Sequence, residues 1–295
     1  MVTIRPRRSV LYMPGSKERA LEKGKTLPTD AIIFDLEDAV APDMKDMARD
    51  QVASAVQAGG YGQRELIIRV NGLDTPWFEA DLKAAASAKP NAILIPKVSS
   101  GDDIRSVRDQ LKALGADASI DLWAMMETPL AMLKALDIAE SGPAENNRLA
   151  VFIMGTNDLS KETGAVIKPG REAMLAWLST CVAAGRAFGI DIVDGVYNDF
   201  KDEEGFKREC QQGSDLGMDG KTLIHPGQIE PCNEIFSPSA DAVEWAKKII
   251  EAFEQPENQG KGAITVEGKM VELLHAEMAK RTVAISDAIE ALKAS

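Results

Sequence analysis

Cysteine and histidine are scarce in this chain of 295 residues, which contains three cysteines and two histidines. Cys181, Cys210 and Cys232 are an odd number without a close pair, so a disulfide framework is not expected. Zinc is also disfavoured, because only His225 and His275 are present and no cysteine lies near a second ligand. The composition favours a reducing compartment, and we expect a cytoplasmic protein.

Long apolar runs and an excess of positive charge are also missing. No run approaches the ~18 apolar residues of a membrane span, and the basic residues 1–8 lack the apolar stretch of a signal peptide. The net charge of -12, from 34 Lys+Arg against 46 Asp+Glu, disfavours general nucleic-acid binding. We therefore expect neither a membrane nor a nucleic-acid partner. One phosphorylated small molecule, held by a local basic patch, remains compatible with this charge.

The chain contains instead a recurring unit: a short β-branched run, a turn, and a stretch of helical period. Several runs are continuously apolar, as in strands buried on both faces. Strands that alternate with helices indicate βαβ units and a parallel sheet. Eight such units predict an α/β protein with a (β/α)8 TIM barrel, the alternative being an open doubly wound sheet. The runs begin at Ser9, Ala31, Leu66, Ala92, Leu122, Leu149, Ile190 and Thr222.

The last part of the chain departs from this pattern. Residues 238–255 have the pattern of an amphipathic helix, and the polar, turn-forming residues 255–262 suggest a hinge. A strand-like piece at 263–266 and a helical stretch at 269–292 follow. We expect a barrel domain over residues 1–255 and a small C-terminal lid or subunit-contact segment over residues 256–295.

Polar side chains follow nearly all of the predicted strands. In a TIM barrel, functional residues lie at the C-terminal ends of the strands, so these side chains are expected to converge on one mouth. Solvation of separate loops is the alternative, but the number of such endings favours a site. The residues are Asp35, Glu37, Asp38, Arg69, Asn71, Lys97, Glu127, Asn157, Asp158, Asp191, Asp194 and His225.

Glu127 and Asp158 follow neighbouring predicted strands at the same end of the barrel. Two carboxylates on rigid strands, with positions left open for water and substrate, suit Mg²⁺, a hard ion that prefers oxygen ligands. The alternative is that one or both cap the helices that follow, as Asp158 could do for the helix beginning near Leu159.

Arg69 stands at the end of the third predicted strand. A buried guanidinium needs a partner, and a planar carboxylate is the natural one. That carboxylate belongs either to the substrate or, in a structural salt bridge, to Glu37 or Asp38. Both arrangements are compatible in turn.

A basic cluster surrounds the first predicted strand. A helix N-terminus after a Gly-Ser turn can help to hold phosphate, whereas a solvated helix face is the alternative. The cluster comprises Arg7, Arg8, Lys17, Arg19, Lys23 and Lys25, with the turn at Pro14, Gly15 and Ser16.

Several short motifs occur along the chain, at residues 8–15, 35–42, 68–72, 95–97, 126–128, 155–159 and 220–228. Taken together and in this order, they resemble the citrate lyase β-subunit-like family of Mg²⁺-dependent carbon–carbon lyases that act on CoA thioesters, which includes malyl-CoA lyases. Each motif is weak alone, but the match runs nearly from end to end.

The resemblance implies a barrel with a C-terminal lid in a homotrimer or homohexamer. It implies Mg²⁺ on Glu127 and Asp158, and Arg69 on the carboxylate of a keto acid or hydroxy acid. Residues 69–76 resemble the malyl-CoA lyase version of their motif. Glu37 and Asp38 are further candidate catalytic residues. The segment from Pro14 through Lys17, Arg19 and Lys25 is the candidate site for the CoA phosphates.

One position departs from the malyl-CoA lyase pattern. Members of that type carry an aspartate in the tail that reaches a neighbouring subunit's site, whereas residues 268–272 here end in Glu272. The extra methylene changes where an acid/base group can reach. Glu272 is the candidate for proton transfer at the thioester carbon.

The predicted activity is Mg²⁺-dependent cleavage of a 3-hydroxy-3-carboxyacyl-CoA, such as malyl-CoA or citryl-CoA, into a keto acid and an acyl-CoA. The reverse reaction is a Claisen-type condensation. The alternatives are an acyl-CoA thioesterase on the same site, a CoA-independent pyruvate-type aldolase, and a carrier-dependent citrate lyase β subunit.

Overall fold

The chain forms two compact units in a computed structural model that describes residues 4–142 and 147–293. The larger unit spans Arg7–Phe236. The smaller one comprises the described residues from Ser237 onward, together with those before Arg7. No described helix is both long and apolar enough to cross a bilayer.

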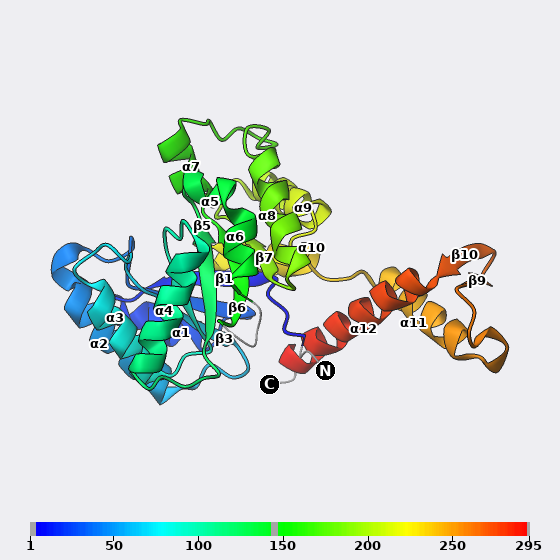
Figure 1. The fold of residues 1–295 in the computed structure, drawn as a ribbon, viewed down its shortest axis with the longest axis horizontal. Coiled ribbons are helices and arrows are strands. Elements are labelled where there is room, and N and C mark those ends of the chain that lie inside the picture. Colours follow the sequence, from blue (N-terminus) through cyan, green and yellow to red (C-terminus); the bar gives the residue numbers. More distant parts are fainter. Residues whose placement is uncertain (1–3, 143–146, 294–295) are drawn as a thin grey trace. The chain divides into compact units, whose positions relative to one another are not determined.

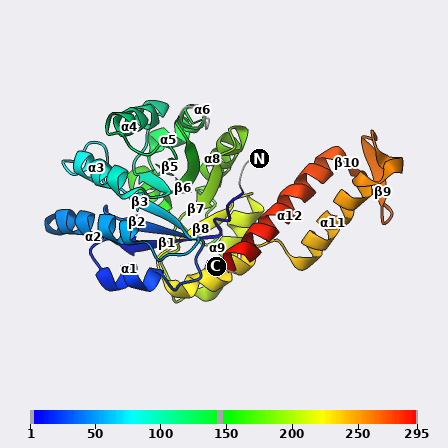
Figure 2. The ribbon, with the colours of Figure 1, turned by 90° about the horizontal axis from the view of Figure 1, so that it is seen from below.

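The larger unit is a closed barrel of parallel strands in sequence order, surrounded by helices (Figures 1 and 2). Closure is direct, because the first strand pairs in parallel with both the second and the eighth. The predicted (β/α)8 barrel is confirmed, and the open-sheet alternative is wrong. The strands are β1 (Ser9–Pro14), β2 (Ala31–Asp35), β3 (Glu65–Arg69), β4 (Ala92–Ile95), β5 (Asp121–Met126), β6 (Leu149–Met154), β7 (Asp191–Asp194) and β8 (Gly220–Leu223).

One or two helices follow each strand, and those before β8 connect consecutive strands, as a barrel of parallel strands requires. They are α1 (Glu18–Gly24), α2 (Lys45–Ala58), α3 (Phe78–Ala88), α4 (Gly101–Ala113), α5 (Pro129–Leu133), α6 (Ala135–Glu140), α7 (Thr156–Thr163), α8 (Leu175–Ala187), α9 (Glu203–Asp215) and α10 (Ile229–Ile235). Short 3-10 turns at Pro42–Met44 and Pro226–Gln228 precede α2 and α10.

Successive residues of each strand face opposite sides of the barrel wall, so the core has two layers. In β2, for example, Ile32 and Phe34 belong to the outer layer, between the strands and the helices. Ile33 belongs to the inner layer, which fills the barrel with residues including Trp123. The barrel interior is therefore packed, and a ligand can enter only at an end of the strands.

The end at which the strands begin is closed by ion pairs. Arg7 lies 2.8 Å from Glu65 and 2.6 Å from Asp191, with its guanidinium 5.3 Å from the ring centre of Trp123. Arg8 pairs with Asp30 at 2.7 Å. The prediction that Arg7 and Arg8 belong to a phosphate-binding cluster is wrong, because both are committed to pairs at this end. Asp191 begins β7 and likewise does not lie at the mouth.

A buried charge network joins β7 and β8 to the outer helices. The Asp194 carboxylate lies 2.8 Å from the Lys221 ammonium and 2.7 Å from the Arg171 guanidinium, and Lys221 also lies 2.7 Å from Glu209. Burial alone would raise the pKa of Asp194, but Lys221 and Arg171 more than offset this and hold it below its usual range. Asp194 thus serves the barrel wall, and its predicted place at the mouth is wrong.

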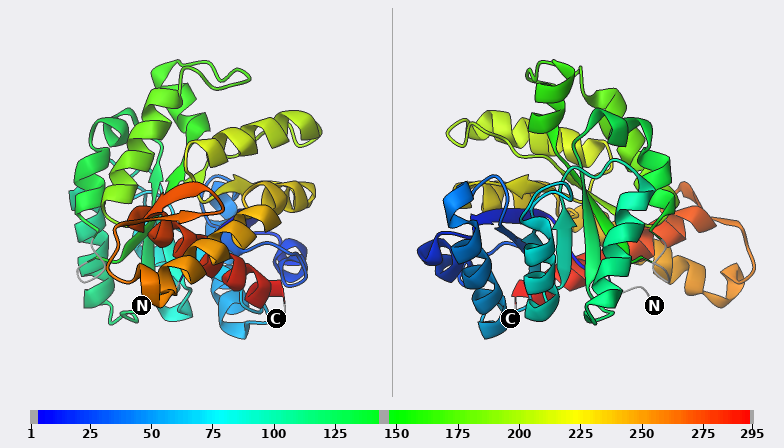
Figure 3. Two further views of the ribbon diagram at one scale, coloured as in Figure 1. Left: turned by 90° about the vertical axis from the view of Figure 1, so that its right-hand side faces the viewer. Right: turned by 60° about the vertical axis from the view of Figure 1, so that its left-hand side comes forward.

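The smaller unit consists of helices α11 (Ala240–Glu254) and α12 (Leu273–Lys293) and an antiparallel pair, β9 (Ala263–Val266) and β10 (Lys269–Glu272), all orange to red in Figure 3. A 3-10 turn at Pro256–Asn258 follows α11. The unit has its own apolar cluster, in which Ile249 of α11 packs with Ile264, Val271 and residues of α12.

The boundary between the units differs from the expected one at 255/256. Helix α11 belongs to the C-terminal unit, because its apolar face packs with the hairpin and α12. An amphipathic pattern shows that a helix has an apolar face, but it does not show which neighbour covers that face.

Candidate active site

The C-terminal ends of the strands enclose a cavity of about 310 Å³. Strands β1, β2, β3, β5, β6 and β8 contribute to it, as do the loops after β2, β6 and β7. Its lining residues are Tyr12, Asp35, Asp38, Ala39, Arg69, Met125, Met154, Gly155, Thr156, Asn157, Asp158, Val196, Asn198, Thr222 and Ile224.

Arg69 is the buried cation of this cavity. It makes a two-pronged contact with Asp35, with Nε 2.7 Å from Oδ1 and Nη2 2.6 Å from Oδ2. Its Nη1 lies 2.7 Å from Oε2 of Glu37, while the exposed carboxylate of Asp38 is 3.7 Å away. The structural partners of Arg69 are therefore Glu37, as predicted, and Asp35, which was not predicted as its partner. Arg69 also lines the cavity.

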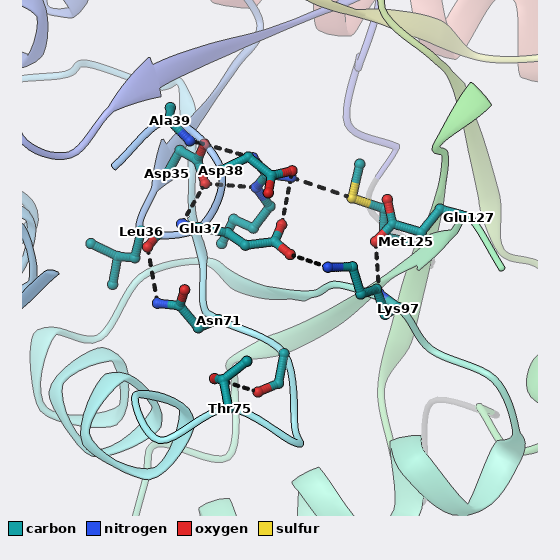
Figure 4. Close-up of polar contacts among 12 residues, drawn as sticks. Asp35, Leu36, Glu37, Asp38, Ala39, Asn71, Thr75, Lys97, Met125 and Glu127 are labelled. Carbon is teal, nitrogen blue, oxygen red and sulfur yellow. Dashed lines mark hydrogen bonds and ion pairs between the residues drawn. The ribbon is translucent and has the colours of Figure 1, made fainter. Parts of the chain in front are cut away.

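The loop after β2 is held rigidly around these carboxylates (Figure 4). Asp35 accepts hydrogen bonds from the backbone N–H groups of Glu37 and Ala39, at 2.9 and 3.1 Å. Lys45, the first residue of α2, donates to the carbonyl oxygens of Leu36 and Glu37, at 2.8 and 2.7 Å. These contacts fix the backbone at Glu37, whose side chain pairs with Arg69 and Lys97. Burial raises the pKa of Glu37 although Arg69 opposes the shift.

Glu127 follows the last residue of β5 and is almost fully buried, with 1% of its surface exposed. Its position is fixed because Thr128 and Pro129 begin α5 at once, the Thr128 hydroxyl accepting from the N–H of Ala131. The Lys97 N–H donates to Oε1 at 2.8 Å (Figure 4). Burial, then the nearby Glu37 carboxylate, raises the pKa of Glu127 to about 8.

Lys97 is a site residue that the strand endings suggested but to which the sequence gave no role. Its backbone has a positive φ of 53°, an uncommon conformation for a residue with a side chain. This conformation accompanies the hydrogen bond from its N–H to Glu127, while its ammonium lies 3.5 Å from Oε1 of Glu37. Lys97 thus links the two buried glutamates.

Asp158 lies in the first turn of α7, and its half-buried side chain lines the cavity. The cap of this helix is Gly155, which has no side chain, so the alternative in which Asp158 caps the helix is wrong. Within the part of the chain that the structure describes, the Asp158 carboxylate has no hydrogen bond or ion pair with another side chain.

The two carboxylates fit a divalent cation. Burial is the main cause of the raised pKa of Glu127, and the charges of Glu37 and Asp158 add to it, whereas Arg69 opposes it. A bound cation would offset this repulsion between the carboxylates. Residues 4–142 and 147–293 contain no cluster of three or more Cys, His, Asp or Glu side chains placed to hold a metal. A cation here would be bound by the Glu127 and Asp158 carboxylates, and water and substrate would complete its coordination shell. This arrangement is typical of Mg²⁺.

Gly155 allows the close approach of β5 and β6 at this point. A Cβ added there would lie 2.3 Å from the Cβ of Glu127 and 2.7 Å from its Oε2, so only glycine fits without moving that carboxylate. Its φ of -91° is ordinary, which means that the space and not the backbone conformation requires glycine.

The remaining basic candidates lie around α1. Lys17 and Arg19 are exposed, and the Lys17 N–H donates to the carbonyl oxygen of Pro14 at 3.0 Å. Lys25 is half-buried, pairs with Glu22 at 2.7 Å and lies 5.7 Å from the Tyr61 ring centre. Lys17 and Arg19 are therefore better placed than Lys25 to receive a phosphate.

Glu272 ends β10, which belongs to the smaller unit, whereas the residues of the cavity belong to the larger unit. Its N–H donates to Nδ1 of His275 at 2.9 Å, which fixes the start of α12. The catalytic role of Glu272 stays a prediction.

Several cavity residues were not predicted. Tyr12 and Thr222 face the barrel interior because of the two-residue alternation of their strands, which was the signal available in the sequence. Asn198 forms reciprocal side-chain hydrogen bonds with Asn157, at 2.9 and 3.2 Å. The loop after β7 that carries Asn198 gave no signal at all.

A TIM barrel with a buried guanidinium and several carboxylates at the C-terminal ends of its strands has the composition of a site for small acids. The family model described as HpcH/HpaI aldolase/citrate lyase matches residues 8–226, from the start of the barrel to β8 and beyond. The chain belongs to this family and is an enzyme of the citrate lyase β type.

The chain is similar to curated proteins over nearly its whole length. It is 54% identical to the (3S)-malyl-CoA thioesterase of Cereibacter sphaeroides over 290 residues, which cover 98% of each chain. It is 31% identical to the mitochondrial citramalyl-CoA lyase of Homo sapiens, covering 97% of this chain and 87% of that protein. The predicted family is confirmed.

Among solved structures, the chain is similar to CitE from Mycobacterium tuberculosis in complex with magnesium, acetoacetate and coenzyme A. The TM-score is 0.74 at 26% identity, and the match covers 95% of this chain and 99% of that one. The fold prediction is confirmed by this similarity as well.

Proposed function

We propose that this enzyme hydrolyses the thioester of a 3-hydroxy-dicarboxylic acyl-CoA of the malyl-CoA type, with Mg²⁺ at Glu127 and Asp158. The observation that carries the proposal is the 54% identity, over 98% of both chains, to proteins named (3S)-malyl-CoA thioesterase. This ranks the hydrolase, an alternative in the sequence analysis, above the lyase. The acidic substrate agrees with a small cavity whose buried cation is Arg69.

The residues of the barrel divide the work as follows. Arg69, held in place by Asp35 and Glu37, attracts the carboxylate of the acyl group. A bound Mg²⁺ would stabilise negative charge that develops on the substrate oxygens. In the hydrolysis, a water oxygen bonds to the thioester carbon, the carbon–sulfur bond breaks, and the CoA sulfur leaves with a proton. Glu37, whose raised pKa suits proton uptake, is the candidate base in the barrel.

A carbon–carbon lyase is the second candidate, favoured by the 31% identity to citramalyl-CoA lyase. The same carboxylate contact at Arg69 would hold the part of the substrate that leaves as a keto acid. Loss of the hydroxyl proton leads to cleavage of the carbon–carbon bond, and the thioester enolate then takes up a proton, for which Glu272 is the candidate donor.

We further propose a cytoplasmic homotrimer or homohexamer, with the C-terminal unit as a lid or subunit contact.

The deciding experiment is mass spectrometry of the purified protein with a panel of 3-hydroxyacyl-CoA esters, in Mg²⁺ and in EDTA. Free CoA and intact malate from malyl-CoA, lost in EDTA, would support the hydrolase. Glyoxylate and acetyl-CoA would make the protein a lyase. No turnover of any ester would refute both functions and favour a carrier-dependent subunit or a CoA-independent aldolase.

The substitution Gly155→Ala is expected to weaken Mg²⁺ binding although it removes no ligand. The added Cβ would press on Glu127, and crowding of this kind typically costs about 1–3 kcal/mol. We expect the Mg²⁺ dissociation constant, measured by titration calorimetry, to rise about 10- to 100-fold. Gly262→Ala is the matched control, because no atom lies within 4 Å of its added Cβ. Equal Mg²⁺ affinity in both variants would contradict the proposed metal site.

The double substitution Lys17→Ala and Arg19→Ala tests the predicted CoA site. Exposed cations that contact phosphate through solvent-screened charge each contribute modestly, so we expect the KM for the CoA ester to rise about 3- to 30-fold. The dissociation constant of free malate should not change. Lys83→Ala, at an exposed position of α3, serves as the control. A KM equal to that of the wild type would remove this cluster from the site.

A further inference from the structure

Tyr12 places a hydroxyl on the floor of the cavity without a good partner. Its ring packs against the inner apolar layer of the barrel and lies 4.9 Å from the guanidinium carbon of Arg69. The hydroxyl's one contact among the described residues is the Met125 sulfur, at 4.0 Å. A thioether is a weak acceptor, so this contact leaves most of the donor's hydrogen-bonding capacity unused.

Arg69 directs a donor at the same sulfur. Its Nη1 lies 3.7 Å from Sδ of Met125, while its other contacts engage Asp35 and Glu37. Two strong donors thus converge on one poor acceptor at the bottom of the cavity. Methionine is flexible and can move aside. Two carboxylate oxygens in place of the sulfur would accept stronger hydrogen bonds from these donors.

We propose that the Tyr12 hydroxyl is a substrate-positioning donor that, together with Nη1 of Arg69, binds the acyl carboxylate remote from the thioester. This inference rests on the proposed function, because it assigns the acidic end of that substrate to the cavity floor. A carboxylate offers two oxygens, one for each donor. Burial raises the pKa of Tyr12, so the phenol remains a protonated donor at neutral pH.

The dimensions of the site decide which end of the substrate reaches this floor. The cavity of about 310 Å³ suits a short acid and is far too small for CoA. Below Tyr12, the interior of the barrel is filled by residues such as Val10 and Ile33, which are fully buried. The small acid end therefore enters first, and the CoA portion remains at the mouth.

The test is the affinity for L-malate in Mg²⁺, measured by titration calorimetry and compared with that for 3-hydroxybutyrate, which lacks the second carboxylate. Hydrogen bonds to charged groups predict that Tyr12→Phe weakens malate binding about 10- to 100-fold. The affinity for 3-hydroxybutyrate should change less than threefold. With the CoA ester, KM should rise by the malate factor while kcat falls less than fivefold.

Two matched variants separate the hydroxyl from the shape of the pocket. Tyr61→Phe removes a hydroxyl that donates to the Leu21 carbonyl outside the cavity, and it should leave malate affinity unchanged. Met125→Leu removes the sulfur but keeps the volume, and it should weaken malate binding less than Tyr12→Phe does, because both donors remain. An equal loss in Met125→Leu and Tyr12→Phe would overturn the inference, since cavity shape would then explain both.

The inference also fails if Tyr12→Phe binds malate within twofold of the wild type, or if the wild type does not prefer malate to 3-hydroxybutyrate. Failure of the proposed function gives a different result. In that case no malyl-CoA is hydrolysed, whereas a preference for malate that depends on the Tyr12 hydroxyl would still show that Tyr12 binds the carboxylate of a small acid.

Discussion

Glu127→Gln is expected to reduce Mg²⁺-dependent turnover by at least about 1000-fold. Loss of one of two protein carboxylates removes the charge that holds the cation, and metal stabilisation of transition-state charge amounts to several kcal/mol. Glutamine keeps the length of the side chain and an oxygen for the Lys97 N–H. The measurement is kcat/KM for the CoA ester as a function of Mg²⁺ concentration, with Mg²⁺ affinity determined by calorimetry.

The stability of Glu127→Gln in the absence of metal is not expected to fall, although its turnover does. Burial and neighbouring carboxylates raise the pKa of Glu127 from 4.5 to about 8. The wild type therefore loses folding free energy as pH rises from 4.5 towards about 8, and the full cost is present above that value. In EDTA the thermal midpoint of Glu127→Gln should therefore equal or exceed that of the wild type at pH 9.

The control is Glu65→Gln at the other end of the barrel, a buried carboxylate that pairs with Arg7. It should lose stability and keep metal-dependent turnover in the folded protein. Turnover of Glu127→Gln that still depends on Mg²⁺ and remains near the wild-type rate would place the metal elsewhere.

Asp194→Asn is expected to destabilise the barrel by about 3–5 kcal/mol, because it leaves the buried cations Lys221 and Arg171 without their shared carboxylate. For a chain of this size the thermal midpoint should fall on the order of 10 °C. The free energy of unfolding from urea titration and the thermal midpoint measure the effect. Asp102→Asn is the control, because Asp102 is exposed and pairs only with Arg105 in the next turn of α4.

The stability difference between the wild type and Asp194→Asn is expected to depend on pH. The pKa of Asp194 is held below its usual range, and an unfolded aspartate titrates near pH ~4. The stabilisation from its charge is therefore present above about pH 4 and is lost as pH falls through the lower folded pKa. The stability gap between wild type and Asp194→Asn should be constant near neutral pH and should narrow in acid. A gap that does not change down to pH 3 would contradict this assignment.

The sequence predicted much of this site because the rules that place it are local. Continuous apolar runs such as 149–154 identify strands buried on both faces, and eight of them predict a barrel. In a barrel of parallel strands, a residue that directly follows a strand must lie at the mouth. Glu127 directly follows β5, Arg69 ends β3 and Asp158 lies in the helix after β6. Arg69 and Asp158 line the cavity, and the Glu127 carboxylate accepts a hydrogen bond from Lys97 at the same end of the strands.

The errors at Asp191 and Asp194 arise because a strand's sequence states neither where its ends fall nor which side of the wall a side chain faces. Asp191 and Asp194 occur in one short run, yet the first begins β7 beside Arg7 and the second pairs with Lys221 behind the barrel wall. The alternation of side chains across the wall, together with the register of β7, decided both positions.

The amino-acid sequence by itself determined the strand–helix alternation, the family and the acidic residues at the mouth, since these depend on local periodicity and on short motifs. Only the tertiary structure decided that Asp35 holds Arg69, that α11 packs with the C-terminal hairpin, and that Tyr12 shares the cavity floor with Met125. Each of these contacts joins segments far apart in the chain. Side chains choose among such partners by packing and charge in three dimensions, and spacing along the sequence carries no record of that choice.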